Sequence, residues 1–413
     1  MNDLSALSPK PAHIPDAAVY DFDMYLDPAL LADPHERVRE MLREAPPVFW
    51  TPRNRGHWVA IGHEAVFEIS RDCDRFSNEY MAREDMQKMM AMMPAGMPYI
   101  PQAKPISLDP PDHGKFRAPL ASVFGPKAIK ARTDEIRALA GSLIDAVADQ
   151  GRCDFISSVA EPLPVQVFLK MMGLPLERQA EFRHMVHEFL APGSSDPMQT
   201  AGRMRMVADA LDEVILARKD DRRDDLISLL WAAEIDGQPM TLETMEDFAV
   251  LLFIAGLDTV INGMGYGVRH LARNPEFQDR LRADPSLIPE AVEELLRRYT
   301  FTVPPRRVAQ DTEIAGWTLK KDEWLMLYLP AADLDPGAFA APEVFDLDRE
   351  DNHIAFGVGP HRCLGSHLAR LELQVLYTEL LARLPTFRLD ADKPVTFHAG
   401  NIIAMDSLPL RWD

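Results

Sequence analysis

The feature that most constrains this chain is a long apolar stretch with helical periodicity between Leu242 and Arg273. Its centre, from Phe248 to Leu257, is the longest uninterrupted apolar run in the sequence. That run is much shorter than the roughly 20 apolar residues that cross a bilayer, so we expect no membrane-spanning segment. A helix of roughly 32 residues is about 48 Å long at about 1.5 Å per residue. We therefore expect this helix to cross the whole of a soluble, folded molecule.

The rest of the chain shows mainly helical periodicity. Helices are expected over residues 128–150, 175–190, 200–218, 275–283, 288–299 and 366–383. Short β-prone runs over 58–61 and 324–329 predict a small sheet. Residues 1–20 contain three prolines and little apolar pattern, so they are expected to form a flexible leader. Because no internal repeat and no Gly/Ser linker is visible, residues 21–413 are predicted to form a single domain, mainly α with a minor β-sheet.

The charge balance excludes one large class of partners. The chain has 44 Lys and Arg against 64 Asp and Glu, a formal net charge of -20, whereas a nucleic-acid-binding face is basic. Three cysteines are too few for a disulfide framework. The N-terminus has no basic stretch followed by an apolar core, as a secretory signal would have. We expect a cytoplasmic, monomeric protein that binds neither nucleic acid nor membranes.

Cys363 has the most informative surroundings of the three cysteines. It lies in Phe-Gly-Val-Gly-Pro-His-Arg-Cys-Leu-Gly over residues 356–365, just before a predicted helix. The glycines and proline build a tight loop, and a helix N-terminus favours a thiolate. A lone cysteine is usually a small buried hydrophobe, but this loop favours a metal-bound thiolate. A zinc site with His361, Cys363 and His367 as ligands is disfavoured because no second pair of ligands lies nearby.

A methionine-rich segment follows the N-terminal part of the chain. Seven of the 21 methionines fall between Met81 and Met97, interleaved with charged residues. Methionine is flexible and polarizable, so the cluster could line an adaptable apolar pocket. A surface helix with its apolar side turned inward explains the pattern equally well.

Residues 356–365 resemble the cysteine-ligand loop of the cytochrome P450 superfamily, the haem-thiolate monooxygenases. Glu294-Leu295-Leu296-Arg297 resembles the Glu-x-x-Arg motif of that family, and Ala255-Gly256-Leu257-Asp258-Thr259 resembles its oxygen-activation motif. The resemblance implies the cytochrome P450 fold, haem b as cofactor and Cys363 as the ligand of the haem iron. A Glu/Arg pair three residues apart is often a solvated bridge on a helix surface. The apolar setting of Glu294 and Arg297 favours a buried, structural pair.

The resemblance also assigns roles around the oxygen-activation motif. Gly256 loosens the helix and admits dioxygen and water, Thr259 supplies a hydroxyl to the iron-bound oxygen, and Asp258 relays protons from solvent. The alternative for Asp258 is a structural, salt-bridged carboxylate. The expected haem contacts, including four groups for the propionates, are His113, Arg117, Arg307, His361, Gly256 and Phe356. His113 and Arg117 stand one helical turn apart, a spacing that directs both side chains to one target.

Further segments resemble the bacterial camphor-hydroxylase branch over nearly the whole chain: residues 19–25, 56–58, 75–77, 256–260 and 408–412. This implies O2 as co-substrate and electrons from a [2Fe-2S] ferredoxin with an NADH-dependent ferredoxin reductase. The expected substrate contacts are Leu251, Ile254, Ala255 and Val303, with Ile402, Tyr99 and the methionines of 81–97 as further candidates. The camphor enzyme binds its substrate ketone with a tyrosine, but Pro101 stands at that position and Tyr99 lies two residues away. A small terpenoid, larger or less polar than camphor, is therefore expected as substrate.

Two other functions share part of this pattern. A haem-thiolate peroxygenase would use hydrogen peroxide directly and would not need the Asp258-Thr259 pair. A non-enzymatic haem carrier or sensor would need Cys363 and the propionate ligands but not Thr259. Both alternatives can be tested at Thr259.

Overall fold

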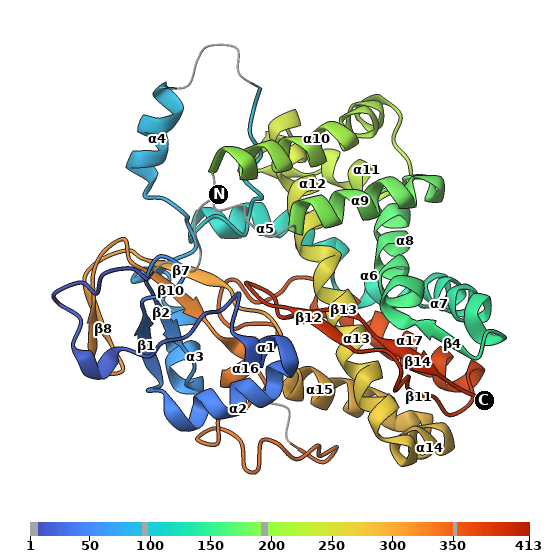
Figure 1. Cartoon of the computed structure of the whole chain (residues 1–413). Coiled ribbons are helices and arrows are strands. Elements are labelled where there is room, and N and C mark those ends of the chain that lie inside the picture. The colour runs from blue at the N-terminus through green and yellow to red at the C-terminus, as the bar shows by residue number, and fades with distance from the viewer. Residues whose placement is uncertain (1–6, 93–97, 191–196, 350–352) are drawn as a thin grey trace. The chain divides into compact units, whose positions relative to one another are not determined.

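The computed structural model describes residues 7–92, 98–190, 197–349 and 353–413 (Figure 1). Contacts between residues divide the chain into two compact units. The first contains Asn78–Arg132 and Glu161–Asp258, and the second contains the described residues up to Ser77 together with Thr133–Ala160 and Thr259–Asp413. The chain passes between the units repeatedly, which explains why the sequence shows no linker and led us to expect one domain.

The first unit is almost entirely helical. Its elements are α4 (Arg83–Met92), α5 (Asp112–Val123), α6 (Pro126–Lys130), α8 (Pro162–Met171), η3 (Leu176–Arg178), α9 (Gln179–Leu190), α10 (Pro197–Asp220), α11 (Leu226–Trp231), β5 (Glu234–Ile235), β6 (Gln238–Pro239) and α12 (Leu242–Gly256). Helix α12 packs against α10, α11 and α8.

The second unit combines helices with several small sheets. Its helices are η1 (Asp16–Ala18), α1 (Pro28–Ala32), α2 (Pro34–Glu44), α3 (His63–Arg71), α7 (Thr133–Ala148), η2 (Ile156–Ala160), α13 (Asp258–Arg273), α14 (Pro275–Ala283), η4 (Pro285–Leu287), α15 (Ile288–Arg298), α16 (Leu329–Ala332) and α17 (Ser366–Arg383). Its smaller sheets are formed by β4 (Arg152–Asp154), β8 (Thr312–Ile314), β9 (Trp317–Leu319), β11 (Arg388–Leu389), β12 (Thr396–His398), β13 (Ala404–Ser407) and β14 (Pro409–Arg411). The prediction of a mainly α protein with minor β structure is confirmed.

The largest sheet contains both β-prone runs seen in the sequence. Its order is β1 (Val48–Thr51), β2 (His57–Ala60), β10 (Trp324–Leu327), β7 (Pro305–Val308) and β3 (Phe76–Ser77), and the first four of these strands are labelled together in Figure 1. Strands β2 and β10 pair in parallel, with Leu325 opposite Trp58. Both side chains are fully buried, so the sheet provides the apolar core of this part of the unit.

The N-terminal segment is packed more tightly than the sequence suggested. Ile14 and Ala18 are buried in the core cluster of the β1–β2 sheet, and Val19 forms a β-bridge with Trp50. The expectation of a flexible leader is therefore wrong for residues 7–20, while residues 1–6 lie outside the described part. Two buried apolar side chains are enough to fix a short segment, although they create no periodic pattern.

The long apolar stretch forms two consecutive helices rather than one. Helix α12 begins after Thr241, whose hydroxyl accepts a hydrogen bond from the Thr244 N–H, and it ends at Gly256. Helix α13 begins at Asp258, and Leu257 between them has φ -99° and ψ -64°. By length and hydropathy the stretch could span a membrane, but 78% of its most apolar window is buried inside the protein, as expected for a core helix. The break falls at Leu257, one residue after Gly256.

Close packing explains glycines further along α13. A Cβ atom on Gly265 would lie 2.9 Å from Cδ1 of Ile156, and one on Gly267 would clash with the hydroxyl of Tyr377. That hydroxyl donates a hydrogen bond to the Gly263 carbonyl at 3.0 Å. The contact between α13 and α17 therefore depends on small residues, and it outweighs the roughly 1 kcal/mol that each interior glycine costs relative to alanine.

Most predicted helices are found, with shifted ends. Helices α14 and α17 have the predicted bounds, whereas the helix expected over 128–150 is divided into α6 and α7. Helix α8 was missed because nearly all of its residues are buried. A helix buried on all sides has no polar face, so its sequence shows no helical period.

Candidate haem site

The segment before Cys363 is a rigid loop. Gly357 and Gly359 have φ of 67° and 75°, a backbone conformation that favours glycine. A Cβ atom on Gly359 would lie 2.7 Å from the Ser70 carbonyl oxygen, so this position has no room for a side chain. The Cys363 N–H donates to the Phe356 carbonyl at 2.8 Å, which closes the loop three residues before α17 begins.

Cys363 is the most accessible of the three cysteines. It is exposed, whereas Cys73 and Cys153 are half-buried. Burial raises the pKa of the Cys153 thiol to about 12, so that residue stays protonated at neutral pH. No neighbouring atom lies within 4 Å of a Cβ placed on Gly357. An exposed thiol beside an uncovered stretch of loop backbone fits an iron atom held in a flat macrocycle.

The start of the loop is tied to α15. The guanidinium of Arg370 lies 4.5 Å from the centre of the Phe356 ring and donates two hydrogen bonds to Glu293, at 2.6 and 2.7 Å. The His353 imidazole contacts the same carboxylate at 3.0 Å. Burial opposes ionisation of Glu293, but the hydrogen bonds from His353 and Arg370 lower its pKa to about 2. This ion pair fixes the position of the loop relative to the helix.

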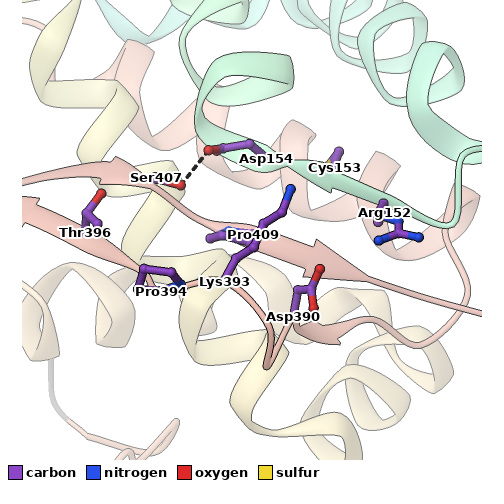
Figure 2. Close-up of a pocket in the computed structure, with 9 residues that line it drawn as sticks. All are labelled: Arg152, Cys153, Asp154, Asp390, Lys393, Pro394, Thr396, Ser407 and Pro409. Carbon is purple, nitrogen blue, oxygen red and sulfur yellow. Dashed lines mark hydrogen bonds between the residues drawn. The ribbon is translucent and has the colours of Figure 1, made fainter.

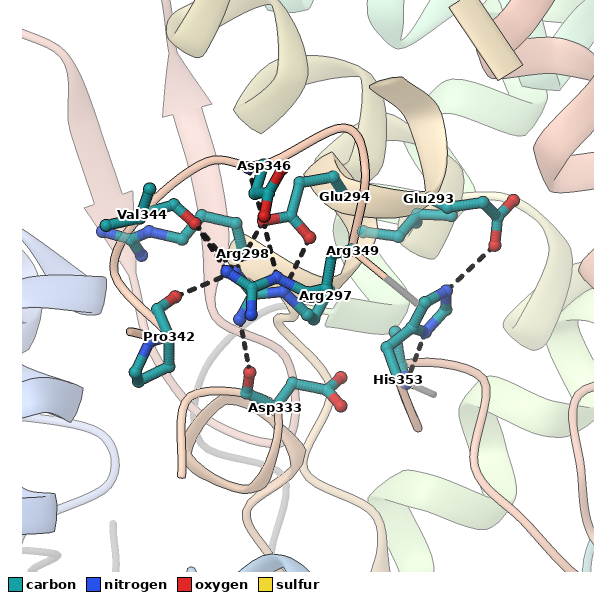
Figure 3. Close-up of polar contacts among 12 residues, drawn as sticks. Glu293, Glu294, Arg297, Arg298, Asp333, Pro342, Val344, Asp346, Arg349 and His353 are labelled. Atoms are coloured by element: carbon teal, nitrogen blue, oxygen red, sulfur yellow. Dashed lines mark hydrogen bonds and ion pairs between the residues drawn. The ribbon is translucent and has the colours of Figure 1, made fainter. Parts of the chain in front are cut away.

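The neighbouring Glu294–Arg297 pair is buried, as predicted, and forms the centre of a polar network (Figure 3). Arg297 donates to both Glu294 oxygens at 2.7 and 2.8 Å, and to the carbonyls of Asp333 and Pro342 at 2.8 Å. Arg349 contacts Glu294 at 3.3 Å. The network joins the last turn of α15 to the irregular segment that leads to the cysteine loop.

The oxygen-activation motif lies at the break between α12 and α13. Asp258 is buried and Thr259 is half-buried in the first turn of α13. Ala255 and Gly256, at the end of α12, are exposed, and no atom lies within 4 Å of a Cβ placed on Gly256. Helix backbone is therefore uncovered directly beside a hydroxyl and a carboxylate.

The candidate propionate ligands belong to different units. His113 and Arg117 lie one turn apart on α5 of the first unit, where burial and, secondly, Arg117 lower the pKa of His113. Arg307 and His361 belong to the second unit. Arg307 donates to Asp322 at 2.9 Å, so its charge already faces a carboxylate.

Arg306 is a residue that the sequence analysis missed. It precedes Arg307 on β7, and successive side chains of a strand point to opposite faces. Arg306 is buried, and its guanidinium donates to the Pro305 carbonyl at 2.8 Å. Two adjacent arginines look equivalent in a sequence, and only the strand geometry separates them.

The candidate substrate contacts lie on α12 and in two paired segments. Along α12, Leu251 is buried, Ile254 is half-buried and Ala255 is exposed. Val303 is fully buried and donates through its N–H to Asn401 at 2.8 Å, and the adjacent Thr302 forms a β-bridge with Ile402. The structure thus brings the segments of Val303 and Ile402 together, although they are about 100 residues apart.

Tyr99 has a defined partner. Its hydroxyl contacts both carboxylate oxygens of Asp247 on α12, at 3.0 and 2.8 Å. The Tyr99 hydroxyl therefore donates its hydrogen bond to Asp247 and not to a ligand.

The methionine-rich segment contains helix α4 up to Met92, and residues 93–97 lie outside the described part. The charged residues Arg83, Glu84, Asp85 and Lys88 are exposed, while Met86 is half-buried. In the described part, these exposed charges and the half-buried methionine match the explanation of the segment as a surface helix.

A pocket of about 290 Å³ lies beside β4 and β14 (Figure 2). It is lined by Arg152, Cys153, Asp154, Asp390, Lys393, Pro394, Thr396, Ser407 and Pro409. None of these is a candidate site residue of the sequence analysis. The Ser407 hydroxyl donates to Asp154 at 2.6 Å, which ties β13 to β4, and this contact gives the pocket wall a structural role.

Comparisons with known proteins identify the family. The Cytochrome P450 family model matches residues 184–412. A probable cytochrome P450 127A1 of Sinorhizobium fredii is 33% identical, with 98% of this chain and 97% of that protein covered. A steroid C26-monooxygenase of Mycobacterium tuberculosis is 34% identical over 89% of this chain and 98% of that protein. The crystal structure of CYP101J2 superposes with a TM-score of 0.87 at 32% identity, covering 98% of this chain and 100% of that one. The chain therefore belongs to the cytochrome P450 family and is a monooxygenase that binds haem b.

Proposed function

We propose that this monooxygenase hydroxylates a small, apolar, terpenoid-like substrate, a monoterpenoid or norisoprenoid ketone or hydrocarbon. The proposal is carried by the side of α12 that holds Leu251, Ile254 and Ala255, which is apolar and becomes exposed toward the helix break. Such a surface holds a hydrocarbon mainly by burial, with few polar contacts to orient it. One similar protein is named for a steroid, another largely apolar ring system, which supports this class of substrate.

The residues of the chain divide the chemistry between them. Bound haem would supply the activation of dioxygen, and a thiolate ligand from the protein would favour O–O cleavage. Cys363 is the proposed ligand, supported by its exposure and by the rigid loop that holds it. Thr259 and Asp258, together at the helix break, are proposed to hold the oxygen and to deliver the protons that O–O cleavage consumes.

The haem propionates need cationic or hydrogen-bonding partners. His113, Arg117 and His361 remain the proposed ligands. For the arginine of β7 we revise the sequence prediction from Arg307 to Arg306, because Arg307 is paired with Asp322 and Arg306 points to the other face of the strand. Phe356 and Gly256 are proposed to contact the macrocycle itself.

A monooxygenase of this type takes electrons from redox partners. The proposed partners are a [2Fe-2S] ferredoxin and an NADH-dependent ferredoxin reductase, and the proposed location is the cytoplasm. The resemblance of segments along the whole chain to the camphor-hydroxylase branch supports this, as does the match with CYP101J2.

The substrate class is tested by optical titration of the ferric protein with camphor, larger ring ketones, norisoprenoids and a steroid. Displacement of water from the iron shifts it from low to high spin. We expect a strong shift with the larger terpenoids and little with camphor, because Pro101 replaces the ketone-binding tyrosine and Tyr99 is bound to Asp247. A full response to camphor would show that another donor replaces that tyrosine. A response to the steroid alone would overturn the terpenoid proposal.

A further inference from the structure

We propose that Asp247 is a positioning residue: it anchors the loop over residues 98–105 to α12 and so sets how tightly the enzyme holds a ligand above the haem. The part that concerns ligand binding rests on the proposed function, in which Leu251 and Ile254 face the substrate.

Asp247 is the meeting point of the loop's polar contacts. Its side chain is completely buried. It accepts hydrogen bonds from the Tyr99 hydroxyl and, at 2.6 Å, from the Gln102 N–H, and Lys104 Nζ lies 3.1 Å away. A buried carboxylate is stable only when hydrogen bonds and opposite charge replace its water shell. Here every one of these partners comes from residues 99–104.

A second contact holds the same loop to α10. Arg205 donates to the Tyr99 carbonyl at 3.2 Å and makes two hydrogen bonds to Glu246, at 2.9 and 3.0 Å. Glu246 is buried and precedes Asp247 on α12. Two adjacent carboxylates of one helix therefore hold the loop, one directly and one through an arginine.

The loop has no regular structure to hold it in place. Residues 98–111 form neither helix nor strand. Lys104 also lies 5.2 Å from the centre of the Phe116 ring, which packs edge-on against Phe248 of α12. The anchoring carboxylate therefore lies beside this aromatic contact of the loop, and its loss would free the segment between Tyr99 and Lys104.

The position of Asp247 on α12 connects the loop anchor to ligand binding. Residues four and seven positions apart share a helix face, so Asp247, Leu251 and Ile254 lie in one row. A loop bound at Asp247 is fixed at the start of the row that the proposed function assigns to the substrate. Asp258 lies beyond the end of α12, and the segment from Asp247 to Gly256 alone spans about 14 Å of helix. Loss of the anchor should therefore change ligand affinity and leave the chemistry near Asp258 and Thr259 intact.

The test compares the haem-loaded wild type with Asp247→Ala and Asp247→Asn. Asparagine keeps the shape and one acceptor for the Gln102 N–H but removes the charge that faces Lys104. The matched control is Asp225→Asn, which alters another buried carboxylate of the same unit, one that caps α11 and pairs with Arg218. Hydrogen–deuterium exchange of residues 98–105 reports the loop without reference to activity. We expect at least about tenfold faster exchange there in Asp247→Ala, a smaller change in Asp247→Asn, and none in the control.

Ligand binding is measured with two probes of the ferric haem. 4-Phenylimidazole is large enough to fill space above the haem, and imidazole is not. We expect the Kd of phenylimidazole to rise about tenfold in Asp247→Ala, equivalent to about 1.4 kcal/mol, with the Kd of imidazole unchanged.

Each possible result supports or overturns one part of the proposal. Unchanged exchange of residues 98–105 in Asp247→Ala overturns the anchor. Faster exchange with an unchanged ratio of the two Kd values overturns its role in ligand binding. If Asp247→Ala does not fold, Tyr99→Phe and Lys104→Met each remove one contact and should each raise exchange of the loop. Failure of the terpenoid titration would contradict the substrate class but would leave the exchange result standing, so the two proposals fail separately.

Discussion

Thr259 occupies the first turn of α13, one residue after a buried carboxylate and next to uncovered helix backbone. A hydroxyl there is placed to hold oxygen while protons arrive from Asp258. The residue is therefore expected to control whether electrons end in product or in peroxide.

Thr259→Ala should uncouple the reaction. With a surrogate ferredoxin and reductase, NADH oxidation is expected to continue while product per NADH falls about 100-fold, the lower end of the usual contribution of a proton-transfer group. Hydrogen peroxide should rise in proportion. Thr259→Ser, which keeps the hydroxyl, should retain most of the yield. An unchanged yield in Thr259→Ala would contradict the role proposed for this hydroxyl.

The two adjacent arginines of β7 provide a second residue-scale prediction. Arg306→Ala should accelerate transfer of haem to an excess of an apo-globin acceptor, because a propionate loses a charged partner. Arg307→Ala should leave the transfer rate near that of the wild type, since it removes the contact with exposed Asp322. The reverse order would restore Arg307, the residue predicted from sequence.

At the scale of elements, helix α17 contains an unusual buried acid. Glu372 is fully buried, and its Oε2 has no hydrogen-bond partner among the described residues. Burial raises the pKa of Glu372 to about 8 from an ordinary value of 4.5. The native protein therefore keeps a proton that the unfolded chain loses above about pH 4.5.

This difference predicts a pH dependence with a definite sign. The native state binds more protons between about pH 4.5 and pH 8, so the free energy of unfolding should fall as pH rises through that range and level off above it. Glu372→Gln should remove this fall and raise Tm above the wild type at pH 8, with little difference near pH 5. Thermal unfolding of the wild type and of Glu372→Gln between pH 5 and pH 9 measures this difference in Tm. Parallel curves of Tm against pH for the two proteins would contradict a buried, neutral Glu372.

The network around α15 predicts a larger effect. Removing one partner of a buried ion pair leaves an uncompensated charge and costs about 3–5 kcal/mol. Glu294→Gln and Arg297→Lys should therefore both lower Tm strongly and reduce haem content, since lysine cannot make the four contacts of the guanidinium. Arg388→Lys, on the exposed strand β11, is the control and should change neither quantity. Normal haem content in Arg297→Lys would contradict a link between the network and the cysteine loop.

At the scale of the whole molecule, sequence reasoning worked where a pattern is local. The ends of α17 and the two strands β2 and β10 follow from periodicity, and the cysteine loop follows from its glycines. It failed where position depends on distant parts of the chain: Ile14 is buried by strands formed much later in the sequence, and α8 lacks a polar face. The partner of Tyr99 is 148 residues away, so no local pattern could have shown it.

The parallel pairing of β2 with β10 has a consequence for how the chain folds while it is being synthesised. Trp58 leaves the ribosome roughly 270 residues before its neighbour Leu325, which at about 5–20 residues per second is a delay of roughly 15 to 50 s. During that time the β1–β2 hairpin presents an unpaired edge and an unfilled apolar face, the kind of surface on which nascent chains aggregate. Yield on overproduction should therefore depend on chaperones that cover the N-terminal hairpin until the last quarter of the chain arrives.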